Sequence, residues 1–151
     1  LSVTPEYLRN KATYSGAVDF RDWQIPLGRR FRSLKLWFVL RTYGVSGLQA
    51  FIRHGVLMAQ KFESWVAAQP RLKLVLPRSL ALVCFRADSD NNTKLLMERV
   101  NQTGRVFLTH TSLFGNYTIR AHFAGQYTQN QHVDELKTIL TQELDRLAVD
   151  G

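Results

Sequence analysis

The spacing of apolar residues changes at Pro70, and this change constrains the fold more than any other feature of the 151-residue sequence. Before Pro70, apolar side chains recur every three or four residues, as on one face of an amphipathic helix. The members of this stripe are Leu48, Phe51, Ile52, Gly55, Met58, Ala59, Phe62, Trp65 and Val66. After Pro70, the run Leu72-Lys73-Leu74-Val75-Leu76 begins with an apolar–polar alternation, as a strand does. The sequence therefore predicts a long helix followed by a sheet.

Capping and turn residues place the other elements. A first helix over residues 29–43 is predicted to break at Gly44, and Ser46 is predicted to be the N-cap of the long helix. The remaining predicted elements are strands at 72–76, 80–85, 106–110 and 117–123, turns at 88–92 and 114–116, and a short helix at 93–101 ending near Gly104. Thr128 and Gln131 have the spacing of a capping box before a last amphipathic helix. This order predicts an α+β fold, a small antiparallel sheet covered by helices.

Several classes of protein are excluded by simple features. No apolar run approaches the ~20 residues that cross a bilayer, and the polar start shows no secretory signal peptide. We therefore expect a cytoplasmic protein with no membrane partner. The single Cys84 lies in an apolar strand pattern and is predicted to be a buried structural thiol. No metal site is predicted, because the histidines have no paired spacing and no cysteine partner; they are His54, His110, His122 and His132.

The positive charge is concentrated in residues 23–62, which contain no Asp or Glu. The seven cations of this segment are Arg29, Arg30, Arg32, Lys35, Arg41, Arg53 and Lys61. The whole chain has 20 basic and 12 acidic residues, a net charge of +8, so the rest of the chain is nearly balanced. Such a segment binds an anion or faces an acidic surface that lies outside this sequence.

Binding of RNA or single-stranded DNA is one way to use this charge, because surfaces that combine cations with aromatic rings hold single strands. The basic stretch does contain aromatic residues, including Trp37 and Phe38. Both fall on the apolar side of the helical pattern, however, and are predicted to be core residues. A basic nucleic-acid-binding module therefore stays as an alternative, and the main interpretation has no nucleic-acid partner.

The same segment carries a family resemblance. Its residues 23–38, WQIPLGRRFRSLKLWF, resemble the hallmark segment of the group II pyridoxal-phosphate-dependent amino-acid decarboxylases, and most closely that of the aromatic L-amino-acid (DOPA) decarboxylases. The similarity continues at residues 43–45, 47–50 and 62–64, and returns at 82–86 and 119–120. It covers essentially the whole chain.

The resemblance implies the aspartate-aminotransferase fold (fold type I), of which this chain would be the C-terminal third. Residues 1–22 would be the mobile catalytic loop region, 23–70 the end of the large domain and the connecting helices, and 71–151 the small C-terminal α+β domain. The family's cofactor, pyridoxal 5'-phosphate, is bound covalently by a lysine in an Asn-x-His-Lys-type segment that this sequence lacks. The expected partners are therefore the N-terminal part of the same enzyme and a second subunit of a homodimer, and this chain alone is expected to be inactive.

The resemblance also implies a catalytic residue. Residues 5–8, Pro-Glu-Tyr-Leu, resemble the mobile loop, and Tyr7 would be the group that protonates the substrate carbon after carbon dioxide leaves. Such a donor must be brought close by loop closure, which also excludes water. Relatives that oxidatively deaminate their substrate carry Phe at this position, so Tyr7 favours formation of the amine.

Further residues match the family's active site. Pro26, Leu27 and Gly28 correspond to the segment that reaches the pocket across the dimer, and Gly28 stands where histidine decarboxylases have Ser, which favours a bulky aromatic substrate. Arg21 and Arg120 match arginines near the site and are expected to support it. The implied function is conversion of an aromatic L-amino acid (DOPA, tyrosine or 5-hydroxytryptophan type) to the amine and carbon dioxide. A homologue that keeps the scaffold without activity is a second alternative.

Overall fold

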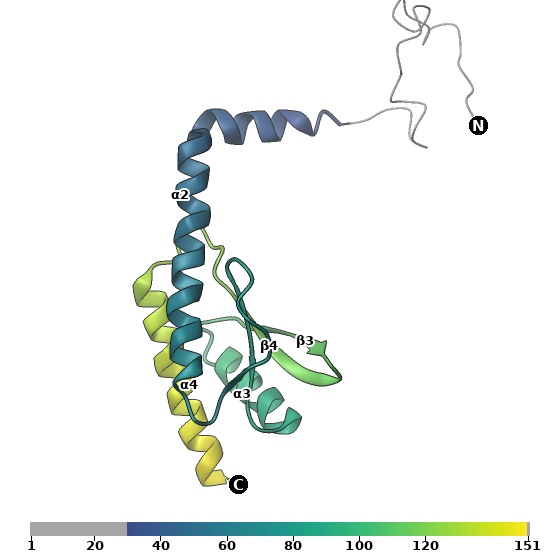
Figure 1. Ribbon diagram of the computed structural model, residues 1–151, viewed down its shortest axis with the longest axis vertical. Helices are drawn as coiled ribbons and strands as arrows, with labels where there is room; N and C mark the ends of the chain where they lie inside the picture. Colours follow the sequence, from purple (N-terminus) through teal and green to yellow (C-terminus); the bar gives the residue numbers. More distant parts are fainter. Residues whose placement is uncertain (1–29, 151) are drawn as a thin grey trace, which may run out of the picture. The chain divides into compact units, whose positions relative to one another are not determined.

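The computed structural model describes residues 30–150. Its elements, shown in Figure 1, are α2 (Ser33–Ala67), β1 (Lys73–Leu74), β2 (Leu82–Arg86), α3 (Asp90–Gln102), β3 (Thr109–Leu113), β4 (Asn116–His122) and α4 (Asn130–Asp150). Within the described residues, the boundary between two units falls between Thr42 and Tyr43. No helix within residues 30–150 is long and apolar enough to cross a membrane.

The four strands form one antiparallel sheet in the order β1-β2-β4-β3. β2 and β4 are the central strands, and their register places Cys84 opposite Arg120 and Phe85 opposite Ile119. β3 and β4 form a hairpin whose two turn residues, Phe114 and Gly115, have φ angles of 51° and 77°. The predicted small antiparallel sheet is thus confirmed.

Helices α2, α3 and α4 pack on one face of this sheet. Val83, Phe85, Ile119 and Ala121 alternate along the two central strands and join a single core cluster with residues of all three helices. At the centre of this core is the fully buried Phe62 of α2, whose ring lies 5.5 Å from Phe85 and 5.3 Å from Phe123. The α+β prediction, a sheet covered by helices, is confirmed.

The opposite face of the central strands carries the alternate residues, and no described helix lies on it. We call it the open face, and its residues on β2 and β4 are Leu82, Cys84, Arg86, Thr118, Arg120 and His122. It is much more polar than the core face, because it holds two arginines, a threonine and a histidine.

The part of α2 after Gly44 lies beside α4 and runs in the same direction (Figure 1). Near the start of α4, the His54 Nε2 atom lies 2.9 Å from the carbonyl oxygen of Thr128. Near its end, Arg71 donates a hydrogen bond to the carbonyl oxygen of Leu144. Gly55 permits the close approach of α2 to the end of β4, since a Cβ atom added there would lie 2.5 Å from the carbonyl oxygen of Phe123.

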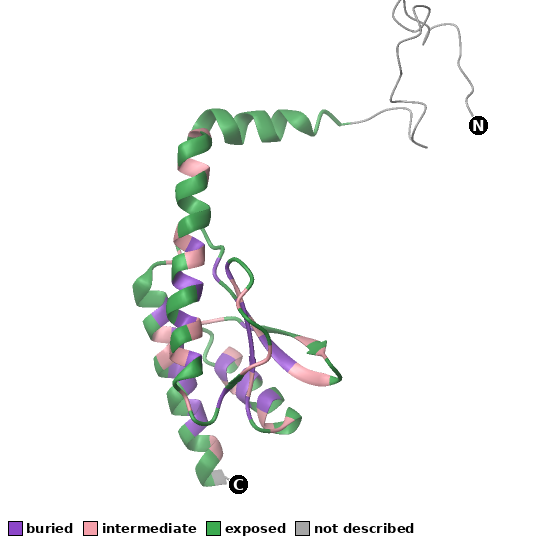
Figure 2. Cartoon of the chain, viewed as in Figure 1, coloured by how far each residue is buried: buried purple, intermediate pink, exposed green. Residues whose placement is uncertain are grey.

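The apolar stripe of α2 is buried only in its second half, as Figure 2 shows. The buried members are Gly55, Met58, Ala59, Phe62 and Val66. The prediction that Trp37 and Phe38 are core residues is wrong for the described chain, because their exposed fractions are 53% and 55%. A stripe predicts burial only where another element is available to cover it. In residues 30–42 the two rings contact each other, 5.2 Å apart, and Arg41 lies over Trp37.

The predicted helix break at Gly44 is confirmed by its non-helical φ and ψ of 64° and 171°. Ser46 is not an N-cap, because helical geometry resumes directly after Gly44. The short helix α3 begins at Asp90, not at residue 93, because Ser89 serves as its N-cap and accepts from the Asn92 N–H at 3.1 Å. The predicted turn at 88–92 is therefore partly the first turn of a helix.

Further boundaries differ from the prediction. The strand expected at residues 72–76 is only the two-residue β1, Lys73–Leu74. β3 begins at Thr109 instead of residue 106, because the Asn101 side chain bonds both the N–H and the carbonyl oxygen of Leu108 and takes that residue out of the strand ladder. α4 begins at Asn130. The capping contact at its start is made by His132, whose Nδ1 accepts a hydrogen bond from the Gln129 N–H at 2.9 Å. A histidine at the third helical position thus does what the predicted Gln131 was expected to do.

Candidate functional site

Most of the predicted site residues lie outside the described residues. These are Tyr7, Arg21, Pro26, Leu27 and Gly28. Their roles stay predictions. The structure does describe Arg120, which lies in β4 on the open face of the sheet.

Arg120 is held by two neighbouring strands. Its Cα partners are Cys84 on β2 and Thr109 on β3, so its backbone is fixed on both sides. The residue is half-buried, and within residues 30–150 its guanidinium makes no hydrogen bond or ion pair. A half-buried cation without an acidic partner is a natural site for a carboxylate or a phosphate, because a guanidinium can bind either in bidentate fashion.

Cys84 lies opposite Arg120 and is buried, as predicted. Burial raises the pKa of its thiol, and the positive charge of Arg120 acts in the opposite direction with a smaller effect. Because a thiolate is the reactive form, a raised pKa makes Cys84 a poor nucleophile. Cys84 is therefore best described as a structural thiol that packs beside Arg120 across the β2–β4 pair.

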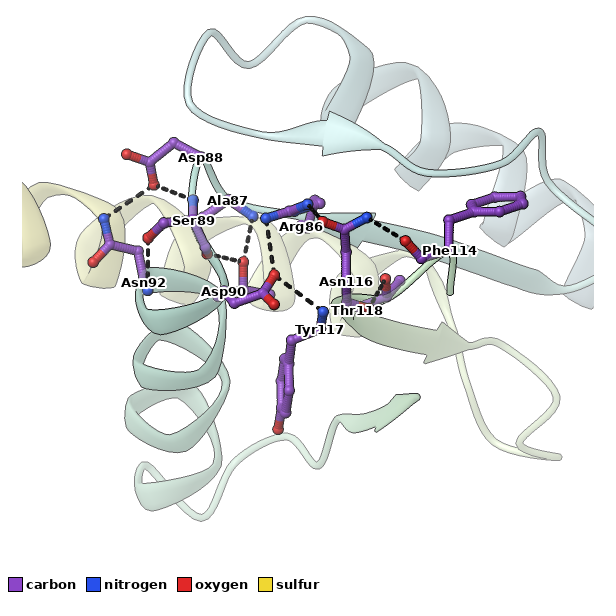
Figure 3. A network of polar contacts seen from close by, with 11 residues as sticks. Arg86, Ala87, Asp88, Ser89, Asp90, Asn92, Phe114, Asn116, Tyr117 and Thr118 are labelled. Atoms are coloured by element: carbon purple, nitrogen blue, oxygen red, sulfur yellow. Dashed lines mark hydrogen bonds and ion pairs between the residues drawn. The ribbon is translucent and has the colours of Figure 1, made fainter. Parts of the chain in front are cut away.

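A second arginine on the open face, Arg86, is the centre of a polar network (Figure 3). One terminal nitrogen donates to Oδ1 of Asp90 at 2.9 Å, and the other donates to Oδ1 of Asn116. The same Asp90 oxygen accepts from the backbone N–H of Tyr117 at 3.0 Å. Arg86 and Asp90 thus connect the end of β2, the start of α3 and the start of β4.

The segment between β2 and α3 is held by short-range hydrogen bonds (Figure 3). The buried hydroxyl of Thr93 accepts from the Ala87 N–H at 3.1 Å and donates to the carbonyl oxygen of Ser89 at 2.6 Å. A hydrogen bond from the Asn92 side chain lowers the pKa of Asp88, and bonds from backbone N–H groups lower it further. These contacts fix the direction in which α3 leaves the sheet, and with it the position of Asp90.

Beside the end of β4 lies a hollow of about 240 Å³ whose walls are mostly apolar. Phe51 and Ile52 of α2, the turn containing Leu80, and His122 contribute to its lining. Leu80 has a φ of 50°, which is unusual for a bulky residue. Its single titratable side chain is His122, so the hollow offers no acid–base pair.

The histidines have structural surroundings. His54 contacts Thr128, His132 caps α4, and the ring of His110 stacks on Tyr117 at 4.4 Å. Within residues 30–150 no three His, Cys, Asp or Glu side chains gather as metal ligands would. The lysines of the same range are exposed at the surface, apart from Lys137, which pairs with Asp134. Among the half-buried cations of residues 30–150, Arg120 is the one whose guanidinium is left for an anionic cofactor or substrate.

Sequence reasoning did not identify the Arg86 network. The four-residue spacing of Arg86 and Asp90 was a weak signal, because oppositely charged residues at this spacing often pair. Asn116 gave no signal, since it lies 30 residues from Arg86 in the chain and only the sheet brings them together.

Comparison with known proteins places these features in a family. Residues 1–88 match the pyridoxal-dependent decarboxylase conserved domain. The chain is 45% identical to tryptophan decarboxylase 2 of Oryza sativa subsp. japonica over 97% of its own length and 31% of the relative's. It is 42% identical to phenylacetaldehyde synthase of Arabidopsis thaliana, over 97% and 32% of the two chains.

The fold is similar to a crystal structure of Oryza sativa TDC with PLP and tryptamine. The TM-score is 0.89 at 38% identity, over 97% of this chain and 33% of that one. The chain thus spans about a third of the length of the relatives it matches. It belongs to the pyridoxal-dependent decarboxylase family. The fold-type-I assignment made from the sequence is confirmed.

Proposed function

We propose that this chain is part of a pyridoxal-phosphate-dependent carboxy-lyase that converts an aromatic L-amino acid to its amine and carbon dioxide. The observation that carries the proposal is the 45% identity to a tryptophan decarboxylase over nearly the whole chain. The family match over residues 1–88, which include the basic segment, supports the same conclusion. The guanidinium of Arg120, which has no partner among the described residues 30–150, is compatible with a substrate or cofactor that carries negative charge.

The proposed substrates are amino acids of the DOPA, tyrosine and 5-hydroxytryptophan type. We add tryptophan to these proposed substrates for two reasons. A similar protein from rice is a tryptophan decarboxylase, and the similar crystal structure of Oryza sativa TDC contains tryptamine. Gly28, without a side chain, would leave room for an aromatic ring in the pocket, which Pro26 and Leu27 would also line.

In this proposal the cofactor, held covalently by a lysine outside this chain, withdraws electrons from the substrate carbon when bound. The residues of this chain orient the substrate and supply a proton. Tyr7 would donate its phenolic proton to the carbon that has lost carbon dioxide, with loop closure excluding water. Arg120 would hold a carboxylate or phosphate oxygen close to the reacting group, and Arg21 would have the same role.

The proposal includes the partners expected from the sequence. These are the N-terminal part of the same enzyme and a second subunit in a homodimer, in the cytoplasm. The exposed apolar residues of α2, including Trp37, Phe38 and Ile52, support such partners, because so many large apolar side chains on one helix are usually covered. Size-exclusion chromatography with light scattering tests the homodimer, and cell fractionation tests the cytoplasmic location.

The decisive experiment is an assay of the complete protein with pyridoxal phosphate. Amine formation is measured for tryptophan, tyrosine, DOPA and 5-hydroxytryptophan, with histidine as the control substrate. We expect amine from at least one aromatic substrate and none from histidine. No amine from any aromatic substrate would leave the inactive homologue as the better interpretation.

Tyr7→Phe in the complete protein tests the proposed proton donor. We expect the products to change from amine toward aldehyde, because carbon protonation would lose its donor. An unchanged amine yield would remove this role from Tyr7. The similarity to a phenylacetaldehyde synthase makes the ratio of aldehyde to amine in the unmodified protein an essential measurement.

Nucleic-acid binding is kept as a second candidate because Trp37 and Phe38 are exposed beside Arg41. Fluorescence anisotropy with a labelled single-stranded oligonucleotide at low and at moderate salt tests it. Binding that weakens steeply with salt would support this function. Absence of binding at low salt would eliminate it.

A further inference from the structure

The open face carries two arginines with different surroundings. Because Cys84 pairs with Arg120 and Phe85 with Ile119, the next position places Arg86 opposite Thr118. Arg86 and Arg120 are therefore diagonal neighbours on one face, with Cα atoms about 7–8 Å apart. Two arginine side chains that extended toward each other from this spacing would bring like charges together, and such charges repel unless one of them is neutralised or directed away.

Arg86 is both neutralised and directed away. Its charge is paired with Asp90, and its side chain is only 18% exposed. Its other terminal nitrogen bonds Asn116, which precedes Arg120 by four residues on β4 and lies toward the hairpin turn. Its Nε atom is buried and has no hydrogen-bond partner within residues 30–150, so this side chain is held in place by its two terminal nitrogens.

We propose that Arg86 is a positioning residue for Arg120. Its fork to Asp90 and Asn116 fixes the start of β4, and it keeps the charge of Arg86 away from Arg120. Arg120, which has no acidic partner within residues 30–150, then remains the guanidinium on the open face that can bind the carboxylate of the amino-acid substrate. This inference rests on the proposed function.

Arg86→Lys in the complete protein is the primary test, since lysine keeps the charge but cannot bond two acceptors through a planar fork. We expect KM for the aromatic substrate to rise about tenfold, the equivalent of one polar contact of moderate strength, with kcat changed less than about twofold. Asp90→Asn should raise KM in the same way, because it frees the charge of Arg86. The control is Arg71→Lys, which weakens a similar arginine–aspartate pair at the end of α4, away from the open face. It should leave KM unchanged.

A second readout does not depend on turnover. The rate at which phenylglyoxal modifies Arg120, measured by peptide mass spectrometry, reports how this guanidinium is presented. We expect Arg86→Lys to change this rate at least threefold, and Arg71→Lys to leave it unchanged. A complete protein without decarboxylase activity would refute the proposed function, while the labelling rate would still test the positioning role. The inference is overturned if Arg86→Lys lowers Tm but leaves both KM and the labelling rate of Arg120 unchanged. Arg86 would then have a purely structural role.

Discussion

Gly55 lies in the middle of a helix, and its replacement by alanine sets two effects of opposite sign against each other. Alanine in place of a helical glycine usually stabilises a protein by about 0.5–1 kcal/mol, because the unfolded chain loses conformational freedom. At Gly55, however, the new Cβ atom would lie 2.5 Å from the carbonyl oxygen of Phe123. A carbon and an oxygen are normally about 3.3 Å or more apart, so α2 or the end of β4 must move by ~0.8 Å.

This movement is costly because both partners are fixed. The Phe123 N–H is bonded to the carbonyl oxygen of Ala81 at 2.9 Å, and the next turn of α2 carries the core residues Met58 and Ala59. Overpacking of this kind costs about 1–3 kcal/mol, and a contact with backbone belongs at the upper end of that range. After subtraction of the helix-propensity gain, Gly55→Ala should destabilise the chain by about 1–2 kcal/mol.

Gly47→Ala provides a matched control in the same helix. Its added Cβ atom would lie 3.6 Å from Cβ of Tyr43, an ordinary contact, so only the propensity gain of about 0.5–1 kcal/mol should remain. Equilibrium urea unfolding of the 151-residue chain, followed by far-ultraviolet circular dichroism, measures both values. If Gly55→Ala stabilised the chain as much as Gly47→Ala, the close approach of α2 to the end of β4 would be wrong.

Three other predictions concern the sheet and its connections. Thr93→Val should lower the free energy of unfolding by about 1–3 kcal/mol in the same urea assay, because the buried Ala87 N–H loses its acceptor, whereas Thr93→Ser should retain most of it. Phe114→Asn should stabilise the hairpin by about 1 kcal/mol, since asparagine tolerates a φ of 51° and the Phe114 side chain is 77% exposed; a loss of stability would show that this ring is held by a contact. The lowered pKa of Asp88 means that its stabilising effect is present above its unfolded pKa of about 3.9 and is lost as the pH falls through its lower folded pKa. Asp88→Asn should therefore flatten the dependence of Tm on pH below about pH 4, measured by differential scanning fluorimetry, and an unchanged slope would contradict this.

The elements that the sequence predicted well are those with a local cause. The break at Gly44 follows from the freedom of glycine to adopt a positive φ. Of the central strands, β4 follows from its alternation of polar and apolar residues, and β2 from a short continuous apolar run. The start of β3 could not be predicted, because it depends on the side chain of Asn101, which competes for the backbone of Leu108. Such a contact has no periodicity and leaves no pattern in the sequence.

The family motif and the three-dimensional structure are two kinds of functional evidence with different physical origins. Each identifies residues that the other does not. The family motif points to Tyr7 and Gly28, because the roles we propose for them depend on residue type at a position in a motif. The structure points to Arg86 and Asp90, because the sheet places Arg86 diagonal to Arg120 on the open face and Asp90 pairs with Arg86. Both the family motif and the structure identify Arg120. The motif makes it a candidate site residue, and its guanidinium has no acidic partner within residues 30–150. A variant series centred on Arg120 and its neighbours therefore tests the chemistry of the family and the geometry of this sheet in one set of measurements.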